Sequence, residues 1–271
     1  MDTLRVLMIG AHPDDPDAKG GGTAALYAKA GHVVKLVSLT NGDAGHMTEG
    51  GAPLAWRRRQ EAANAGKVLG VEAYTTLDNH DGMLMPTLDV RDEVISLVRE
   101  FRPDVVFSPR IWDYHPDHRA TGQVVMDALL MCIVPNIVSH VPHLRRMPVL
   151  MLFQDRFQTP YPSRPDVLVD ITSTWEQRID ALHEHTSQMY EYMPYNREAL
   201  HEVPEGDAAR RAWLHNWYDS RIGLLMDVYK PQIVAKYGAE RAAKIIAVET
   251  FEVGEYGAPL TPELMAKIFP F

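Results

Sequence analysis

Short apolar runs alternate with longer segments in the first part of the chain, and apolar residues recur at helical spacing in the longer segments. The short runs predict strands over residues 5–11, 33–40, 74–77, 104–109, 149–153 and 167–171. The longer segments predict helices over residues 23–30, 54–69, 90–101 and 119–131. Strands that alternate with helices are typical of an α/β fold with a mostly parallel sheet and helices on both faces.

The pattern becomes mainly helical toward the C-terminus. Helical patterns cover residues 176–192, 207–229 and 239–248, the last of them leading into a short strand. Residues 193–206, which are rich in proline and contain a glycine, are expected to form a connecting loop. We therefore predict a single domain over residues 1–271. Residues 1–172 would form the sheet core that carries the functional site, and residues 173–271 a mainly helical portion.

Charge and composition exclude several kinds of partner. The 271 residues carry a net charge of −9, which argues against nucleic acid and against an anionic membrane surface, because both attract basic faces. No apolar stretch approaches the roughly 20 residues that span a bilayer, and the N-terminus lacks a signal-peptide pattern. The single cysteine, Cys132, lies in an apolar stretch and fits a core thiol in a reducing compartment. We expect a cytoplasmic protein.

Reactive side chains follow two of the predicted strands. The segment AHPDDPDAKGGGT, residues 11–23, follows the first strand, and WDYHPDH, residues 112–118, follows the fourth. Parallel strands place their carboxyl ends at one edge of the sheet, where such folds bind ligands. Each segment holds two polar residues that are three positions apart and can face one point: His12 with Asp15, and His115 with His118. The two segments are expected to converge on one crevice.

Two imidazoles and a carboxylate suit a divalent metal ion. Catalytic zinc sites use three protein ligands and a water, and the metal lowers the pKa of that water to about 7. A further carboxylate can act as general base, and a protonated histidine can stabilise an oxyanion and then protonate a leaving amine. The set predicts hydrolysis of a carbonyl compound, most simply an amide. Position alone does not divide these roles between the adjacent Asp14 and Asp15.

The combination of AHPDDPD and HPDH resembles the de-N-acetylase family that includes the glycosylphosphatidylinositol-pathway GlcNAc deacetylases and the bacterial LmbE-like deacetylases. The resemblance covers about residues 4–130, including the GGGT segment at 20–23, LTNGD at 39–43 and RRQEA at 58–62. It implies a Rossmann-type fold, a zinc ion and removal of an acetyl group from an N-acetylglucosamine derivative. The implied partner is a small N-acylated substrate, and a trimer or hexamer is compatible with the family.

The resemblance also implies a role for each matching residue. Zinc, with another divalent cation as the alternative, would be held by three ligands: His12, Asp15 and His118. Asp14 becomes the general base and His115 the oxyanion stabiliser and acid, with Asp117 orienting it. Arg58 matches the family arginine that contacts the substrate. Asp81 matches an acidic residue at the sugar pocket.

Two positions depart from the family pattern. Pro16 and Asp17 stand where many members carry a glutamate after the aspartate pair, so the support of the metal site is expected to differ. Asp113 stands where some members carry a tyrosine upstream of HPDH, which removes an extra oxyanion donor. The C-terminal half carries few residues that match.

Plainer interpretations exist for single residues. Asp14 or Asp15 alone would fit a helix N-cap, Arg58 lies in a charge run typical of a solvated helix face, and Asp81-Gly82 would fit a turn. For the whole chain, one alternative is a metal-dependent amidase or esterase that acts on a non-sugar or natural-product substrate. Another is a non-catalytic metal-binding protein of the same fold.

Overall fold

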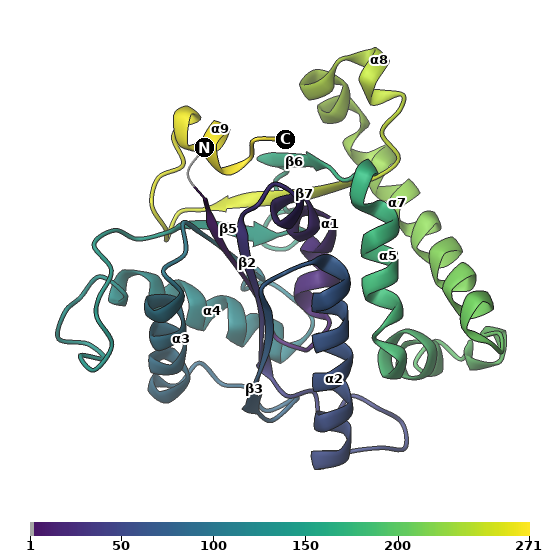
Figure 1. Ribbon diagram of the computed structural model, residues 1–271, viewed down its shortest axis with the longest axis horizontal. Coiled ribbons are helices and arrows are strands. Elements are labelled where there is room, and N and C mark those ends of the chain that lie inside the picture. The colour runs from purple at the N-terminus through teal and green to yellow at the C-terminus, as the bar shows by residue number, and fades with distance from the viewer. Residues whose placement is uncertain (1–2) are drawn as a thin grey trace.

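The computed structural model describes residues 3–271, and its centre is a seven-stranded sheet within that range, in the order β3-β2-β1-β4-β5-β7-β6 (Figure 1). The strands are β1 (Arg5–Gly10), β2 (Val33–Thr40), β3 (Ala73–Asn79), β4 (Val105–Ser108), β5 (Val149–Phe153), β6 (Val167–Asp170) and β7 (Val248–Gly254). β1 to β5 are mutually parallel, whereas β7 runs antiparallel to both β5 and β6. The predicted mostly parallel α/β sheet is confirmed.

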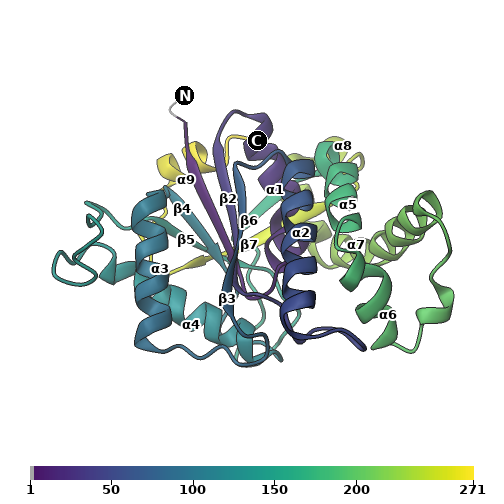
Figure 2. The same cartoon turned by 60° about the horizontal axis from the view of Figure 1, so that its bottom comes forward.

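Helices cover both faces of the sheet. Figure 2 shows α1, α2 and α5 on one face and α3 and α4 on the other, with α7 packed outside α5. The helices are α1 (Asp15–Lys29), α2 (Gly51–Leu69), α3 (Leu88–Phe101), α4 (Pro116–Met131), α5 (Trp175–His183), α6 (Met193–Tyr195), α7 (Asp207–Tyr237), α8 (Ala239–Ala242) and α9 (Pro262–Ile268). Among the described residues, no helix is both long and apolar enough to cross a membrane.

The continuous apolar runs of the sequence arise because the central strands are buried on both faces. Along β1, Val6 and Met8 belong to the core shared with α1 and α5. Leu7 and Ile9 belong to the core shared with α3 and α4. Side chains alternate between the two faces of a strand, so a doubly covered strand has apolar residues at every position.

The first helix begins at Asp15, eight residues before the predicted start at residue 23, and thus includes the glycine triplet. Gly20 has non-helical angles (φ −142°, ψ 15°) and kinks α1 at this point. A Cβ atom on Gly22 would lie 2.7 Å from Ile171, so only glycine lets the helix pack this closely. The glycines therefore allow α1 to pack closely against the sheet and the segment after β6.

The C-terminal region differs from its predicted elements in three places. The helix expected over 176–192 ends at His183, and a π-helical turn, Ser187–Tyr192, follows it. The helix expected to end at residue 229 continues through Pro231 to Tyr237. The predicted 239–248 helix is only α8, and the strand after it, β7, lies inside the sheet between β5 and β6.

Candidate metal centre and active site

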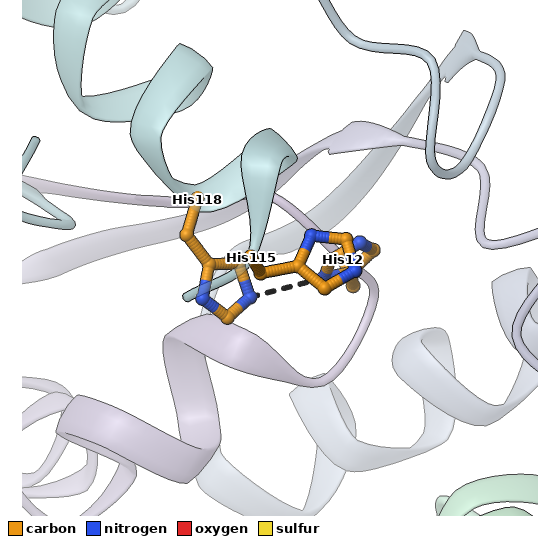
Figure 3. A group of neighbouring side chains, drawn as sticks. All are labelled: His12, His115 and His118. Carbon is orange, nitrogen blue, oxygen red and sulfur yellow. Dashed lines mark hydrogen bonds between the residues drawn. The ribbon is translucent and has the colours of Figure 1, made fainter. Parts of the chain in front are cut away.

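The loops after β1 and β4 meet because these two strands are neighbours, with Val6 paired to Val105 and Met8 to Phe107. The sheet continues from β1 to β2 and β3 on one side and from β4 to β5 on the other, so this is the topological switch point where α/β sheets bind ligands. His118 Nε2 lies 3.2 Å from His12 Nδ1. Figure 3 marks this contact between the two rings with a dashed line. The predicted convergence of the two segments is present.

Three donor atoms form a compact triangle at this point. Asp15 Oδ2 lies 3.2 Å from His12 Nδ1 and 3.3 Å from His118 Nε2. Ligands about 2.1 Å from a tetrahedral ion are separated from one another by about 3.4 Å. The triangle therefore fits one small divalent cation, and the residues are the three that the resemblance selected.

Carboxylates stand behind both histidines of the triangle. His12 Nε2 lies 3.1 Å from Asp81 Oδ1 and 3.4 Å from Asp117 Oδ2. His118 Nδ1 lies 3.1 Å from Asp113 Oδ1. A carboxylate on the far nitrogen of a ligating histidine fixes the orientation of the ring and raises its basicity. Sequence reasoning missed this role for Asp113, although the residue occupies a strand tip together with the histidines.

The charges around the triangle favour positive charge inside it. Burial lowers the pKa of His118, but Asp15 and Asp113 raise it to about 9. Burial likewise opposes protonation of His12, yet Asp117, Asp15 and Asp81 raise its pKa well above the ordinary value. The two histidines in turn hold the pKa of Asp15 well below its usual range against the effect of burial. A cation can supply the same charge by displacing the protons on the imidazoles.

Asp14 and Asp15 do not cap α1. Asp15 Oδ2 accepts hydrogen bonds from the backbone N–H groups of Ala11 (3.0 Å) and His12 (2.8 Å), which aims the carboxylate back toward β1. A Cβ on Gly10 would lie 2.5 Å from Asp15 Cβ, so glycine is required there for this approach. Asp14 occupies the N-cap position but makes no capping hydrogen bond. Its carboxylate is left for another partner.

That partner is Arg58, which is only 3% exposed despite its place in a charge run. Its Nη2 donates to Asp14 Oδ1 at 2.8 Å, and its Nη1 lies 3.4 Å from Asp81 Oδ2. Nη1 also donates to the carbonyl of Gly42, where a Cβ would come within 2.5 Å of the guanidinium. Arg58 thus belongs to the site and not to a solvated face. Contact of Arg58 or Asp81 with a substrate stays a prediction.

His115 is the N-cap residue of α4, and its Nδ1 accepts the backbone N–H of Asp117 at 3.2 Å. Burial and the charges of His12 and His118 lower the pKa of His115. With Nδ1 engaged as an acceptor, the proton of the neutral ring resides on Nε2. One nitrogen each of His12, His115 and His118 lie within 4.8 Å of one another, so His115 is also placed as a further donor to the same ion.

The carboxylate of Asp117 is completely buried and contacts a different segment. It accepts the backbone N–H groups of Gly82 (2.6 Å) and Leu84 (3.2 Å) and faces His12. Its contact with His115 is through the backbone N–H. Asp117 therefore ties the loop after β3 to the metal site, and whether it also orients His115 stays a prediction.

Asp17, at the place of the family glutamate, has a buried partner that the sequence did not reveal. Asp17 Oδ2 lies 2.6 Å from His185 Nε2, and both residues are almost fully buried. Tyr74 Oη lies 3.0 Å from Asp17 Oδ1 and 2.7 Å from the carbonyl of Pro13. Burial lowers the pKa of His185, but Asp17 raises it overall. This ion pair supports the loop that carries Asp14 and Asp15.

Replacing His185 by glutamine should lower the free energy of unfolding by about 3–5 kcal/mol, because it leaves Asp17 buried without its charge partner. Chemical denaturation measures the effect. The matched control is His215→Gln, since His215 pairs with Glu176 and Asp219, whose side chains are 62% and 47% exposed, and such pairs contribute about 1 kcal/mol or less. Equal losses in the two variants would contradict the assignment.

Replacing Asp113 by asparagine should weaken metal binding by about 10–100-fold, the usual effect of removing a carboxylate behind a ligating histidine. Competition with a chromophoric chelator measures the affinity. Asp127→Asn, at an exposed position of α4, is the control and should bind metal as the parent does. An unchanged affinity for Asp113→Asn would show that His118 needs no such support.

Comparisons with known proteins identify relatives of this chain. A model of the family described as GlcNAc-PI de-N-acetylase matches residues 7–129. The diacetylchitobiose deacetylase of Thermococcus kodakarensis is 32% identical over 202 residues, which cover 70% of this chain and 72% of that protein. The 4-oxalmesaconate hydratase of Pseudomonas putida is 27% identical over 206 residues, which cover 72% of this chain and 78% of that protein.

A solved structure of the N,N'-diacetylchitobiose deacetylase from Pyrococcus horikoshii, in complex with an inhibitor, has a TM-score of 0.69 and 26% identity. The match covers 100% of this chain and 88% of that one, so the likeness includes the C-terminal half that the motifs do not reach. Motifs, fold and relatives agree, and the chain belongs to the LmbE-like, or GlcNAc-PI de-N-acetylase, family.

Proposed function

We propose that this protein is a metal-dependent N-deacetylase that removes the acetyl group from an N-acetylglucosamine-type sugar or a conjugate of one. The observation that carries the proposal is the triangle of His12, Asp15 and His118, with sides of 3.2 to 3.3 Å, next to an Asp14 carboxylate free of capping. Relatives named as deacetylases of N-acetylated sugars support the same reaction.

His12, Asp15 and His118 would hold the cation, and three protein donors leave a position open for water and substrate. When bound, the cation supplies a lowered pKa for its water and polarises the amide carbonyl. We assign zinc to the site because two imidazoles and one carboxylate are typical of catalytic zinc.

Asp14 accepts the proton of the attacking water, since its carboxylate neighbours Asp15 and is held by Arg58 at 2.8 Å. His115 donates a hydrogen bond from Nε2 to the oxyanion that forms, because its Nδ1 is engaged by the backbone of Asp117. Because its Nδ1 already accepts the backbone N–H of Asp117, the His115 ring carries a single proton on Nε2 and acts as a hydrogen-bond donor. We therefore assign to Asp14 the step in which the leaving amine receives a proton. The alternative is that His115 donates this proton, as the family pattern implies.

Acetate release from a panel of N-acetylated amino sugars and non-sugar amides tests the proposal. We expect turnover of the sugars, its loss with a chelator, and recovery when zinc is added. Cleavage restricted to non-sugar amides would favour the amidase alternative. Metal-loaded protein that releases no acetate from any of them would favour a non-catalytic metal-binding protein, or another reaction such as the hydration after which the Pseudomonas putida relative is named.

Three finer points stay predictions beside this proposal. They are zinc in preference to another divalent cation, a cytoplasmic location, and a homo-oligomer of three or six subunits. Metal analysis of the purified protein and light scattering test the first and the last.

A further inference from the structure

Three arginines from separate elements gather beside the site. Arg156 follows β5, Arg197 follows α6, and Arg221 lies in α7; all three are exposed. The Cζ atom of Arg197 lies 4.2 Å from the centre of the Trp217 ring, and that of Arg221 lies 5.0 Å from the same ring. One indole thus supports two guanidinium groups, and cation–π contact restricts where they can point.

In the part of the chain that the structure describes, these guanidinium groups have no acidic partner. Within residues 3–271, Arg156, Arg197 and Arg221 form no ion pair or hydrogen bond with a carboxylate, although the chain carries a net charge of −9. Burial and the charges of Arg221 and Arg156 lower the pKa of Arg197. Like charges held together without a counterion repel one another, and a patch of one sign of charge attracts the opposite sign.

Aromatic contacts connect this cluster to the metal centre. Phe157, next to Arg156, packs on Tyr114 with ring centres 6.1 Å apart. The Tyr114 ring lies 6.0 Å from that of His118 and 5.8 Å from that of His115. On the other side, the charges of Arg221 and Asp14 both act on the buried phenol of Tyr218, whose pKa is raised chiefly by burial. The cluster therefore borders the catalytic groups.

We propose that Arg156, Arg197 and Arg221 form a subsite for an oxyanion, a carboxylate or a phosphate, on the amine portion of the substrate. This inference rests on the proposed deacetylation, in which the acetyl portion is uncharged, so a negative charge must belong to the sugar or its conjugate. Guanidinium groups bind both oxyanions through paired N–H donors. The substrate class is then an anionic conjugate of an N-acetylated amino sugar.

The test compares kcat/KM for three substrates: N-acetylglucosamine, its 1-phosphate and its carboxymethyl glycoside. The zinc-loaded parent should prefer at least one anionic substrate by about tenfold or more, the effect of one charge-assisted contact. Which of the two is preferred distinguishes phosphate from carboxylate. The ratio of kcat/KM for the anionic substrate to kcat/KM for N-acetylglucosamine should fall toward one in Arg197→Gln and in Arg221→Gln. In the parent, the same ratio should fall as the salt concentration rises. Arg145→Gln, exposed between α4 and β5, is the control and should keep the ratio.

The ratio within each variant cancels any general loss of folding or turnover. A parent ratio near one, or a ratio kept in both arginine variants, overturns the subsite while leaving deacetylation in place. If no N-acetyl substrate is turned over, the proposed function fails instead. Calorimetry then compares the affinities of the protein for glucosamine 1-phosphate and for glucosamine. Equal affinities in the parent would contradict the subsite. A difference in affinity that the arginine variants keep would contradict it as well.

Discussion

Replacing Asp14 by asparagine should leave the metal bound and lower kcat by about 10²–10⁴-fold, the usual effect of removing a positioned general base. Asp14 lies outside the His12–Asp15–His118 triangle, and its carboxylate is engaged by Arg58 instead. The amide of asparagine keeps the size of the side chain and can still accept from Arg58, but it cannot take a proton from water. Metal content and kcat, measured on the same preparation, check both halves of the prediction.

The control is Asp78→Asn, because the Asp78 side chain is 84% exposed and pairs with Arg59 on the surface. It should keep full activity. An Asp14→Asn variant that retained more than about a tenth of the parent kcat would remove Asp14 from the mechanism, given the size of the effect expected. Loss of the metal would instead place Asp14 among the ligands.

Replacing His118 by alanine should abolish both metal binding and activity. The change leaves only His12 and Asp15 of the triangle. It also removes the imidazole that pairs with the Asp113 carboxylate. Catalytic zinc normally needs three protein ligands, so the remaining pair should not retain the ion through gel filtration. Elemental analysis measures the metal stoichiometry.

His115→Ala is the informative comparison, because His115 also offers a nitrogen near His12 and His118. We expect this variant to keep its metal and lose turnover. If His115→Ala lost its metal and His118→Ala kept it, His115 would be the metal ligand and His118 would be the residue that acts on the substrate. His140→Ala, at an exposed position, should behave as the parent does.

The sequence was sufficient for the parallel part of the sheet and for the meeting of the two loops that carry the predicted metal ligands, for related reasons. Strands buried on both faces appear as unbroken apolar runs, as β1 and β4 do. Because the segments that contain His12 and His115 follow these runs, the reactive residues could be assigned to one edge of the sheet. The start of α1 was missed because Pro16 and the glycine triplet weaken the helical pattern.

Contacts between distant segments could not be predicted in the same way. Nothing near His185 in the sequence indicates that it pairs with Asp17. Arg58 has the pattern of a solvated helix residue, and what buries it is the approach of the Gly42 turn from another loop. The cluster of Arg156, Arg197 and Arg221 joins three elements that carry no shared motif. Such groupings depend on tertiary packing, which local pattern does not encode.

The position of β7 has a consequence for the order in which the protein can be built. The strands that carry the metal loops, β1 and β4, belong to a parallel unit that is complete once β5 has left the ribosome. Among the described residues, β6 pairs only with β7, whose residues 248–254 are synthesised much later. During that interval the outer edges of β5 and β6 are unpaired, a state in which strands readily join other chains. Chaperone dependence during translation should therefore concentrate on the interval between these two strands.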